Sequence, residues 1–228
     1  MRIGALVSGG KDSVFAIQKM IEAGHDIVCM VCLVPENPES YMFHSINTKL
    51  VADISAASGI PLLYQKTGGV KEEELDDMKN ALSALKSEYN ISGVCTGAIE
   101  SVYQKSRVEN ICKTLELEAF SPLWHANPKS LLSEMIDSGM EIIFVTAAAD
   151  GLTESWLGRR LDRAALSDLE RLNQKNYVHI AGEGGEFETA VLDAPFFKKK
   201  IVPIKTNSRW LQNRGYLDIL ETQLIDKN

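Results

Sequence analysis

Apolar, strand-like segments alternate with helix-patterned segments from the N-terminus to about residue 121, and this alternation limits the possible folds most strongly. Residues 26–34, DIVCMVCLV, are nearly continuous in their hydrophobicity, as expected for a strand buried on both faces. Before them, Val14, Ile17 and Ile21 recur at helical spacing. Strict alternation of strand and helix predicts a parallel sheet with helices on both faces. We therefore expect an α/β fold, a doubly wound and mostly parallel sheet.

The same pattern places the other elements. Turn and cap residues bound most of them, for example Gly59 after the apolar positions of residues 50–57. The expected strands are 2–7, 26–34, 61–66, 91–97, 118–121 and 141–149, and the expected helices lie between them and at 129–138.

The regular alternation of strand and helix patterns ends within residues 122–130, PLWHANPKS. A further helix, a glycine-rich segment and two strand-like tail segments follow the strand expected at 141–149. The sequence therefore predicts two domains, residues 1–128 with the parallel sheet and residues 129–228 as a smaller, mixed α/β domain.

Composition excludes several classes of protein. The 228 residues are 45% hydrophobic, and no apolar run reaches the ~18–20 residues that a membrane-spanning helix needs. The N-terminal apolar run has no small-residue cleavage site after it, so we expect a first strand in a cytoplasmic protein. The net charge of −7 disfavours a protein that grips nucleic acid through its phosphates.

Four cysteines stand at positions 29, 32, 95 and 112. Cys29 and Cys32 form a C-x-x-C, a spacing found in zinc and redox sites. Here they lie inside a strand-like run, where residues three apart point to opposite faces, and no matching second pair is evident. We expect core packing from these thiols.

The segment SGGKDS, residues 8–13, interrupts the hydrophobic pattern between the first strand and the first helix. Glycines let backbone N–H groups face an anion, and a helix N-terminus adds partial positive charge. Lys11 supplies a full charge, and the hydroxyls of Ser8 and Ser13 can donate to phosphate oxygens. The segment is not a Walker P-loop, because Gly4 and Gly10 are one residue too far apart and Asp12 follows the lysine.

SGGKDS resembles the SGG-x-DS signature of the PP-loop ATP pyrophosphatases, which cleave ATP between its α- and β-phosphates. With four further segments, the chain is similar to the diphthine–ammonia ligases, or diphthamide synthases, within that superfamily, and in length to their compact archaeal type. The resemblance implies an adenine nucleotide α-hydrolase-like, Rossmann-like fold. The four segments are ENPESYMFHSIN (36–47), GAIESVYQKSRVENIC (97–112), ESWLGR (154–159) and GEGGEFET (182–189).

This resemblance implies an AMP-forming ligase that completes diphthamide biosynthesis on elongation factor 2. The diphthine carboxylate would become an acyl-adenylate with release of pyrophosphate, and ammonia, supplied as ammonium, would then displace AMP. ATP is the implied cosubstrate, Mg²⁺ the implied metal, and elongation factor 2 bearing diphthine the implied partner. The sequence leaves a homo-oligomer open.

Roles for individual residues follow from these motifs. Glu183, Glu186 and Glu188 form a carboxylate cluster that is costly unless a cation is near, either Mg²⁺ or the trimethylammonium group of diphthine. The aromatic residues Tyr41, Trp124, Trp156 and Phe187 could line a cage for that group, or belong to the core. The expected catalytic residues are Lys11, Asp12, Glu183 and Glu186, with Asp12 and Glu183 as metal ligands.

The remaining expected contacts fall into two groups. Glu100, Tyr103, Gln104 and Arg107 share one helical face by their spacing. The expected nucleotide-binding residues are Ser8, Gly9, Gly10, Lys11, Asp12, Ser13, Gly97, Ala98, Tyr103, Gln104 and Arg107. The expected substrate-binding residues are His44, Asn47, Glu100, Trp156, Glu186 and Glu188.

Two alternatives remain at this point. A PP-loop enzyme that modifies tRNA would show a basic groove and reactive cysteines, which the acidic balance and the buried cysteine setting disfavour. A nucleotide-binding sensor without chemistry would bind ATP or AMP and leave it intact.

Overall fold

The structure, a computed structural model, describes residues 1–35, 47, 49–68 and 73–227. The chain divides into two compact units, Met1–Trp124 and His125–Asn228. The sequence placed its boundary near residue 128.

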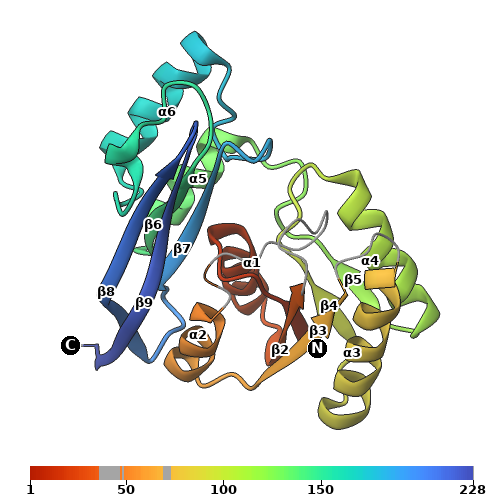
Figure 1. The fold of residues 1–228 in the computed structure, drawn as a ribbon. Helices are drawn as coiled ribbons and strands as arrows, with labels where there is room; N and C mark the ends of the chain where they lie inside the picture. The colour runs from red at the N-terminus through yellow and green to blue at the C-terminus, as the bar shows by residue number, and fades with distance from the viewer. Residues whose placement is uncertain (36–46, 48, 69–72, 228) are drawn as a thin grey trace. The chain divides into compact units, whose positions relative to one another are not determined.

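Unit 1 is built on a five-stranded sheet in the order β3-β2-β1-β4-β5, in which every neighbouring pair is parallel (Figure 1). β1 is central because the chain first winds outward through β2 and β3 and then crosses back to β4 and β5. The elements are β1 (Arg2–Leu6), α1 (Lys11–Glu22), β2 (Asp26–Pro35), α2 (Leu50–Ser58), β3 (Leu62–Thr67), α3 (Glu73–Tyr89), β4 (Gly93–Cys95), α4 (Val102–Thr114) and β5 (Glu118–Phe120).

Helices cover both faces of this sheet. In Figure 1, α1 and α2 lie on one side of the strands and α3 and α4 on the other. On the α3–α4 side, Leu82 and Leu85 of α3 and Ile111 of α4 pack against Val31 of β2 and Val94 of β4. Burial of each such aliphatic side chain contributes about 1.5–3 kcal/mol. The apolar stripes seen in the sequence are therefore the packing faces of these helices.

The two cysteines of the C-x-x-C point to opposite faces of β2. Cys29 belongs to the cluster beneath α3 and α4, together with Val31, and Cys32 is buried outside that cluster. All four cysteines are reduced and buried. Desolvation raises the pKa of Cys29, Cys32 and Cys95 to about 12 and that of Cys112 to about 11. The expected packing role is confirmed.

Unit 2 combines an antiparallel sheet in the order β7-β6-β9-β8 with two helices. Pro128 at the start of α5, together with the Asn127 side chain that accepts from Ser130 N at 3.0 Å, explains where that helix begins. With unit 1, this architecture confirms the expected α/β fold and its smaller mixed second part. The elements are α5 (Pro128–Asp137), β6 (Glu141–Ala147), the 3-10 turn η1 (Glu154–Trp156), α6 (Arg163–Asn176), β7 (Phe187–Asp193), β8 (Lys199–Leu211) and β9 (Arg214–Asp226).

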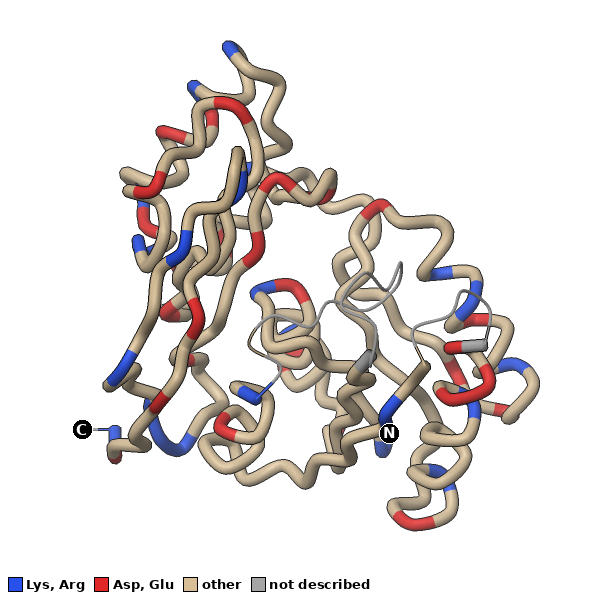
Figure 2. The backbone as a smooth tube through the Cα atoms, in the orientation of Figure 1, with Lys and Arg blue, Asp and Glu red and all other residues tan. Residues whose placement is uncertain are grey.

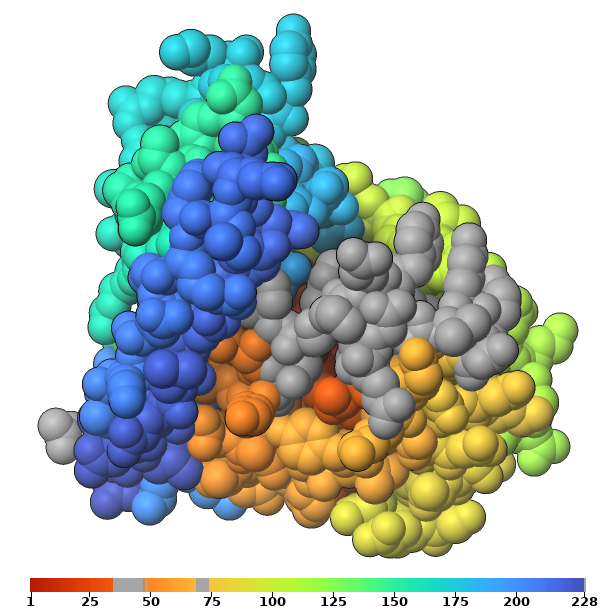
Figure 3. Space-filling view, viewed as in Figure 1, coloured from red at the N-terminus to blue at the C-terminus, as the bar shows by residue number. Residues whose placement is uncertain are grey.

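β8 and β9 form a long hairpin whose side chains make a continuous exposed strip along unit 2 (Figure 3, blue). Its ladder shifts register twice in the middle. Pro203 pairs with Thr222, and the next pair is Lys205 with Glu221, so Ile204 is an extra residue on β8. A matching extra residue, Leu220, follows on β9 and restores the register. Both bulged side chains are exposed.

Charge is distributed over both units. Figure 2 shows basic and acidic positions interspersed along each of them. No helix among the described residues is long and apolar enough to cross a membrane.

The burial of the four cysteines can be tested by labelling their thiols. Because the pKa values of the buried thiols lie at about 11 to 12, only about one thiol in a thousand or fewer is ionised at roughly pH 8. We expect a thiol-specific chromogenic disulfide to label none of the four cysteines in the folded protein within minutes, and all four in guanidinium chloride. Rapid labelling of a thiol in the native protein would contradict the burial described here.

Candidate functional site

The candidate site of unit 1 lies where the strand order reverses. β1 and β4 are parallel neighbours, and their following helices, α1 and α4, cover opposite faces of the sheet (Figure 1). In open parallel sheets, ligands bind beyond the carboxyl ends of the strands at such a point. The segments that follow these two strands are Ser8–Ser13 and residues 96–101, the same two that the sequence singled out.

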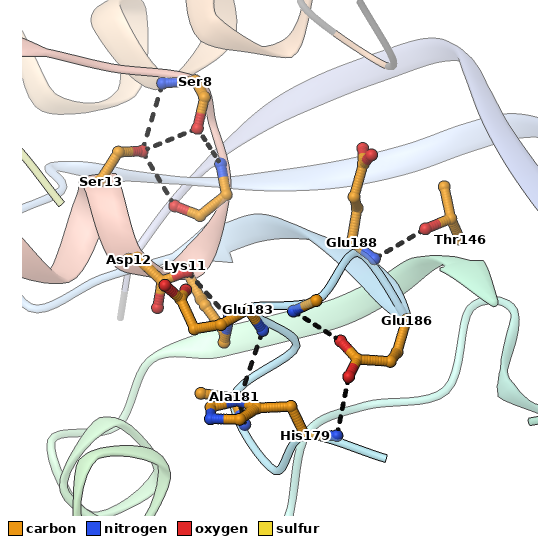
Figure 4. Close-up of polar contacts among 12 residues, drawn as sticks. Ser8, Lys11, Asp12, Ser13, Thr146, His179, Ala181, Glu183, Glu186 and Glu188 are labelled. Carbon is orange, nitrogen blue, oxygen red and sulfur yellow. Dashed lines mark hydrogen bonds and ion pairs between the residues drawn. The ribbon is translucent and has the colours of Figure 1, made fainter. Parts of the chain in front are cut away.

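Two serines close the loop after β1 (Figure 4). Ser13 Oγ accepts from Ser8 N at 3.2 Å and donates to the Gly10 carbonyl at 3.0 Å. The two hydroxyl oxygens lie 3.3 Å apart, and Ser8 Oγ accepts from Gly10 N at 3.4 Å. The hydroxyls therefore shape the loop in addition to the phosphate contacts expected of them.

The loop leads directly into the positive end of α1. The N-cap of this twelve-residue helix is Gly10, which has no side chain to satisfy the first N–H groups. Gly9 before it has φ +86°, in the left-handed region that favours glycine. Backbone N–H groups and the helix dipole thus form the kind of end that binds phosphate or carboxylate.

Lys11 and Asp12 carry the charges at this helix end. Lys11 is only 4% exposed, and its Nζ donates to Asp12 Oδ2 at 2.8 Å. Asp12 Oδ1 is buried and has no hydrogen-bond partner among the described residues. A buried carboxylate oxygen without a donor is costly, and a bound cation or ligand donor would satisfy it. Phosphate-bound Mg²⁺ is compatible with this single carboxylate oxygen.

A close contact with the backbone of α1 explains why residue 97 is a glycine, and the sequence did not reveal this contact. A Cβ at this position would lie 2.6 Å from Asp12 C and 2.6 Å from Ser13 N. The end of β4 therefore touches the backbone of the first turn of α1, and only glycine permits this approach. Ala98 next to it is buried, with its N–H donating to Thr96 Oγ1 at 3.1 Å. Their expected role in nucleotide binding stays a prediction.

The structure brings Tyr103 and Arg107 together on α4. The Arg107 guanidinium lies 3.4 Å from the centroid of the Tyr103 ring, as their spacing of four residues suggests. Gln104 lies between them in sequence, and its N–H donates to the N-cap Ser101 Oγ at 3.3 Å. Glu100 is exposed just before this helix. Nucleotide and substrate contacts by these residues stay predictions.

Asn47 is placed at the entrance to α2. Its backbone has φ +55°, and its carbonyl accepts from Leu50 N at 2.8 Å. His44, expected to bind substrate, and Tyr41, one of the four aromatic residues, lie outside the described residues.

Unit 2 contributes the glycine-rich loop that precedes β7. Within it, the Glu186 carboxylate accepts from two backbone N–H groups, those of His179 and Gly184, each at 2.9 Å (Figure 4). Glu183 is exposed, and its own N–H donates to His179 Nδ1 at 3.3 Å. Glu188 lies on β7, with its N–H donating to Thr146 Oγ1 at 2.7 Å. The three glutamates therefore have different surroundings, and sequence spacing gave no indication of this.

Trp156 has a packing role. It is 5% exposed, its ring meets Phe144 edge to face at 4.9 Å, and the Arg159 guanidinium lies 4.5 Å from its centroid. Phe187 also packs against Phe144, with the ring centroids 5.0 Å apart. These aromatics belong to the core of unit 2, the second of the two roles that the sequence allowed.

The described residues contain no group of three or more His, Cys, Asp or Glu side chains arranged to hold a metal ion. Mg²⁺ is often held by one or two carboxylates together with substrate phosphates. A Mg²⁺ site therefore does not need three or more protein ligands. Metal binding by Asp12 and Glu183 stays a prediction.

Comparison with known proteins identifies the family. A model described as the diphthamide synthase N-terminal domain matches residues 1–119, and one described as the diphthamide synthase C-terminal domain matches residues 127–225. The chain belongs to the diphthamide synthase family. The resemblance seen in the sequence is thereby confirmed, and the family is one of enzymes whose curated members are named as ligases.

Relatives from animals resemble the chain over most of its length. A diphthine–ammonia ligase from Danio rerio is 40% identical over 223 residues, which cover 89% of this chain and 86% of that protein. The one from Homo sapiens is 38% identical over 255 aligned positions, with 100% and 94% covered. Among solved structures, a crystal structure of a predicted subunit of tRNA methyltransferase from Methanocaldococcus jannaschii resembles the chain with a TM-score of 0.46. The two proteins are 16% identical in sequence, and the superposition covers 86% of this chain and 98% of the other. This last likeness indicates neither function nor fold.

The contact at Gly97 yields a direct test. Gly97→Ala should destabilise unit 1 by about 1–3 kcal/mol, because the methyl group would meet backbone atoms that cannot rotate away. Gly68→Ala is the matched control, since a Cβ there meets no atom of the described residues within 4 Å. Urea unfolding followed by circular dichroism measures both. Equal stability of the two variants would contradict the close approach of β4 and α1.

Proposed function

We propose that the chain amidates the carboxylate of diphthine on elongation factor 2, using ATP and ammonium and releasing AMP and pyrophosphate. The observation that carries this proposal is the N-terminal end of α1, which has no side-chain cap and carries a buried lysine, at the reversal point of a parallel sheet. The names of the relatives, which are diphthine–ammonia ligases, support the choice of substrate.

The loop Ser8–Ser13 would hold the phosphates of ATP. The N–H groups at the start of α1 would donate to phosphate oxygens, and the Lys11 ammonium would offset their negative charge. Burial strengthens this attraction, because water is largely excluded around Lys11. Asp12 keeps the ammonium in place through the bond from Nζ to Oδ2.

In the first step, an oxygen of the diphthine carboxylate attacks the α-phosphorus. An O–P bond forms, the bond from the α-phosphorus to the bridging oxygen breaks, and pyrophosphate leaves with that bonding pair. Negative charge grows on the leaving pyrophosphate, and the donors of the α1 end and Lys11 stabilise it there.

In the second step, ammonium gives up a proton to solvent, and the resulting ammonia attacks the carbonyl carbon of the acyl-adenylate. A C–N bond forms, the C–O bond to AMP breaks, and the nitrogen loses a proton to solvent. A mixed anhydride is a better acyl donor than a carboxylate, which is why ATP is consumed. All four cysteines are buried with raised pKa values, so a thiolate intermediate is not part of this route.

Mg²⁺, when bound, would neutralise charge on the phosphates and orient them for in-line displacement. Asp12 is the residue of unit 1 that would hold it, through the oxygen Oδ1 that lacks a hydrogen-bond partner among the described residues.

A reconstituted reaction tests the proposal. The protein would be incubated with ATP, Mg²⁺, ammonium and elongation factor 2 that carries diphthine. Mass spectrometry should find the amide in place of the acid, with AMP and pyrophosphate released in equal amounts. Formation of ADP would contradict cleavage at the α-phosphorus. Intact ATP would favour a nucleotide sensor, and modification of tRNA in a parallel incubation would favour the tRNA-modifying alternative.

Lys11→Ala should lower the rate of AMP formation about a hundredfold or more, because the charge that stabilises the leaving phosphates is lost. The matched control is Lys19→Ala, which removes a lysine from the last turn of the same helix, where it pairs with Glu22 at 3.2 Å. This control should keep its activity. If both variants amidate at the same rate, Lys11 has no part in the reaction.

A further inference from the structure

The β8–β9 hairpin, the exposed strip of Figure 3, carries apolar side chains on its outward face. Successive residues of a strand point to opposite faces, and the buried Ile201 and Leu217 mark the inward one. Ile204 and Leu220 each lie three residues further along their strands, so both are on the outward face. They are 55% and 57% exposed. Exposed apolar side chains that gather on one face are typical of an interaction surface.

A pair of opposite charges lies between the two bulges on the same face. Lys205 is the ladder partner of Glu221, and one bulge lies on either side of this pair. Glu221 lies three residues before Leu224, the ladder partner of the inward Ile201, so its side chain is outward. Cross-strand partners share a face, so Lys205 is outward as well, and both residues are exposed.

Neither of these two charges forms an ion pair with another described residue, although the two are ladder partners. Every other charged residue of the hairpin has a partner. Lys199 pairs with Asp226 at 3.4 Å, Lys200 with Glu141, and Arg209 with Asp218 at 2.7 Å, while the Arg214 guanidinium lies 5.7 Å from the centroid of the Tyr216 ring. Within the described residues, Lys205 and Glu221 are therefore the charges of this hairpin that can pair with an external group.

The outward face is complementary to itself under a two-fold rotation. If two copies meet through this face about an axis parallel to the strands, β8 of each copy lies over β9 of the other. Lys205 of each copy then meets Glu221 of the other, once on each side of the axis. Ile204 and Leu220 each lie beside their own counterpart across the axis, on the two sides of the charged groups. An interface of this kind uses the same patch on both copies.

We propose that the outward face of the β8–β9 hairpin joins two copies of this chain in a two-fold symmetric dimer, centred on two Lys205–Glu221 pairs between the copies. Charge favours a second copy as the occupant, because a uniformly acidic or basic partner would place a like charge against one of these two residues. The interface closes on itself, so the assembly stops at two copies. This inference does not depend on the proposed function.

The size of the face indicates a reversible dimer. Each strand has thirteen residues, which span about 43 Å at about 3.3 Å per residue, and two strands are about 10 Å wide. Two copies would therefore bury about 900 Å² in total, at the lower end for specific interfaces. We expect a dissociation constant on the order of 10 µM.

Sedimentation velocity of the full chain tests the proposal. Between about 1 and 500 µM, the native protein should change from monomer to dimer as its concentration rises. In Glu221→Lys and in Lys205→Glu, like charges would meet on both sides of the axis. Each variant alone should raise the dissociation constant about tenfold or more. A native protein that stays monomeric throughout would overturn the proposal.

An equimolar mixture of these two variants gives the decisive measurement. One variant is basic at both positions and the other is acidic at both, so a mixed dimer brings opposite charges together at both contacts. The mixture should therefore dimerise about as well as the native protein. The like charges within each hairpin remain after mixing, so any recovery reports contacts between copies alone. A mixture as monomeric as its components would refute the Lys205–Glu221 contact.

Two further variants test the location of the interface. Lys79→Glu makes the same change of charge at an exposed position of α3 and should dimerise like the native protein. The double variant Ile204→Ser and Leu220→Ser should stay monomeric, with little change in its unfolding temperature because both side chains are exposed. A dimer that persists in the serine variant would overturn the proposal. If the native protein is monomeric and this variant binds elongation factor 2 more weakly, the face belongs to the protein substrate instead.

Discussion

The contact between Gly97 and the first turn of α1 is the constraint on which the site of unit 1 depends. Two segments more than eighty residues apart in sequence meet there with no side chain between them. This contact places the loop after β1 against the end of β4, at the reversal of the sheet. Lys11 is buried at that place, and its ammonium needs Asp12 beside it to make burial tolerable. The Lys11–Asp12 ion pair, the N-terminus of α1 and Gly97 therefore lie together at one place in the fold.

Much of this fold could be predicted from the sequence, because burial imposes a period on it. Residues 26–34 form β2 (Asp26–Pro35), and Gly59, with φ +77°, ends α2 as its place in the pattern indicated. Strand order could not be predicted, since each strand shows only that it is buried and not which strand lies beside it. The contact at Gly97 was equally hidden, because a glycine does not reveal whether a ligand or a helix backbone fills the space beside it.

Among the candidate functional residues, too, some could be predicted from the sequence and others could not. The loop Ser8–Ser13 could be singled out as a candidate because a polar, glycine-rich segment interrupts two apolar ones, and the structure places it between β1 and α1. The glutamates of unit 2 could not be told apart, since spacing does not say which carboxylate turns toward the backbone. Trp156 shows a related limit: a tryptophan suits a cation cage or a core equally, and only its burial against Phe144 distinguishes the two. His179 had no sequence signal beyond its place before the glycines.

The paired bulges of the C-terminal hairpin have a consequence for how the chain behaves at high concentration. β8 is the border strand of its sheet, and a long, regular border offers a template on which further strands can assemble into fibres. Pro203 lacks an N–H donor, Ile204 breaks the even spacing of the ladder, and Lys205 places a charge beside both. Together they interrupt the row of groups that an incoming strand would have to match. Apolar side chains can therefore remain on this surface without making it a nucleus for aggregation.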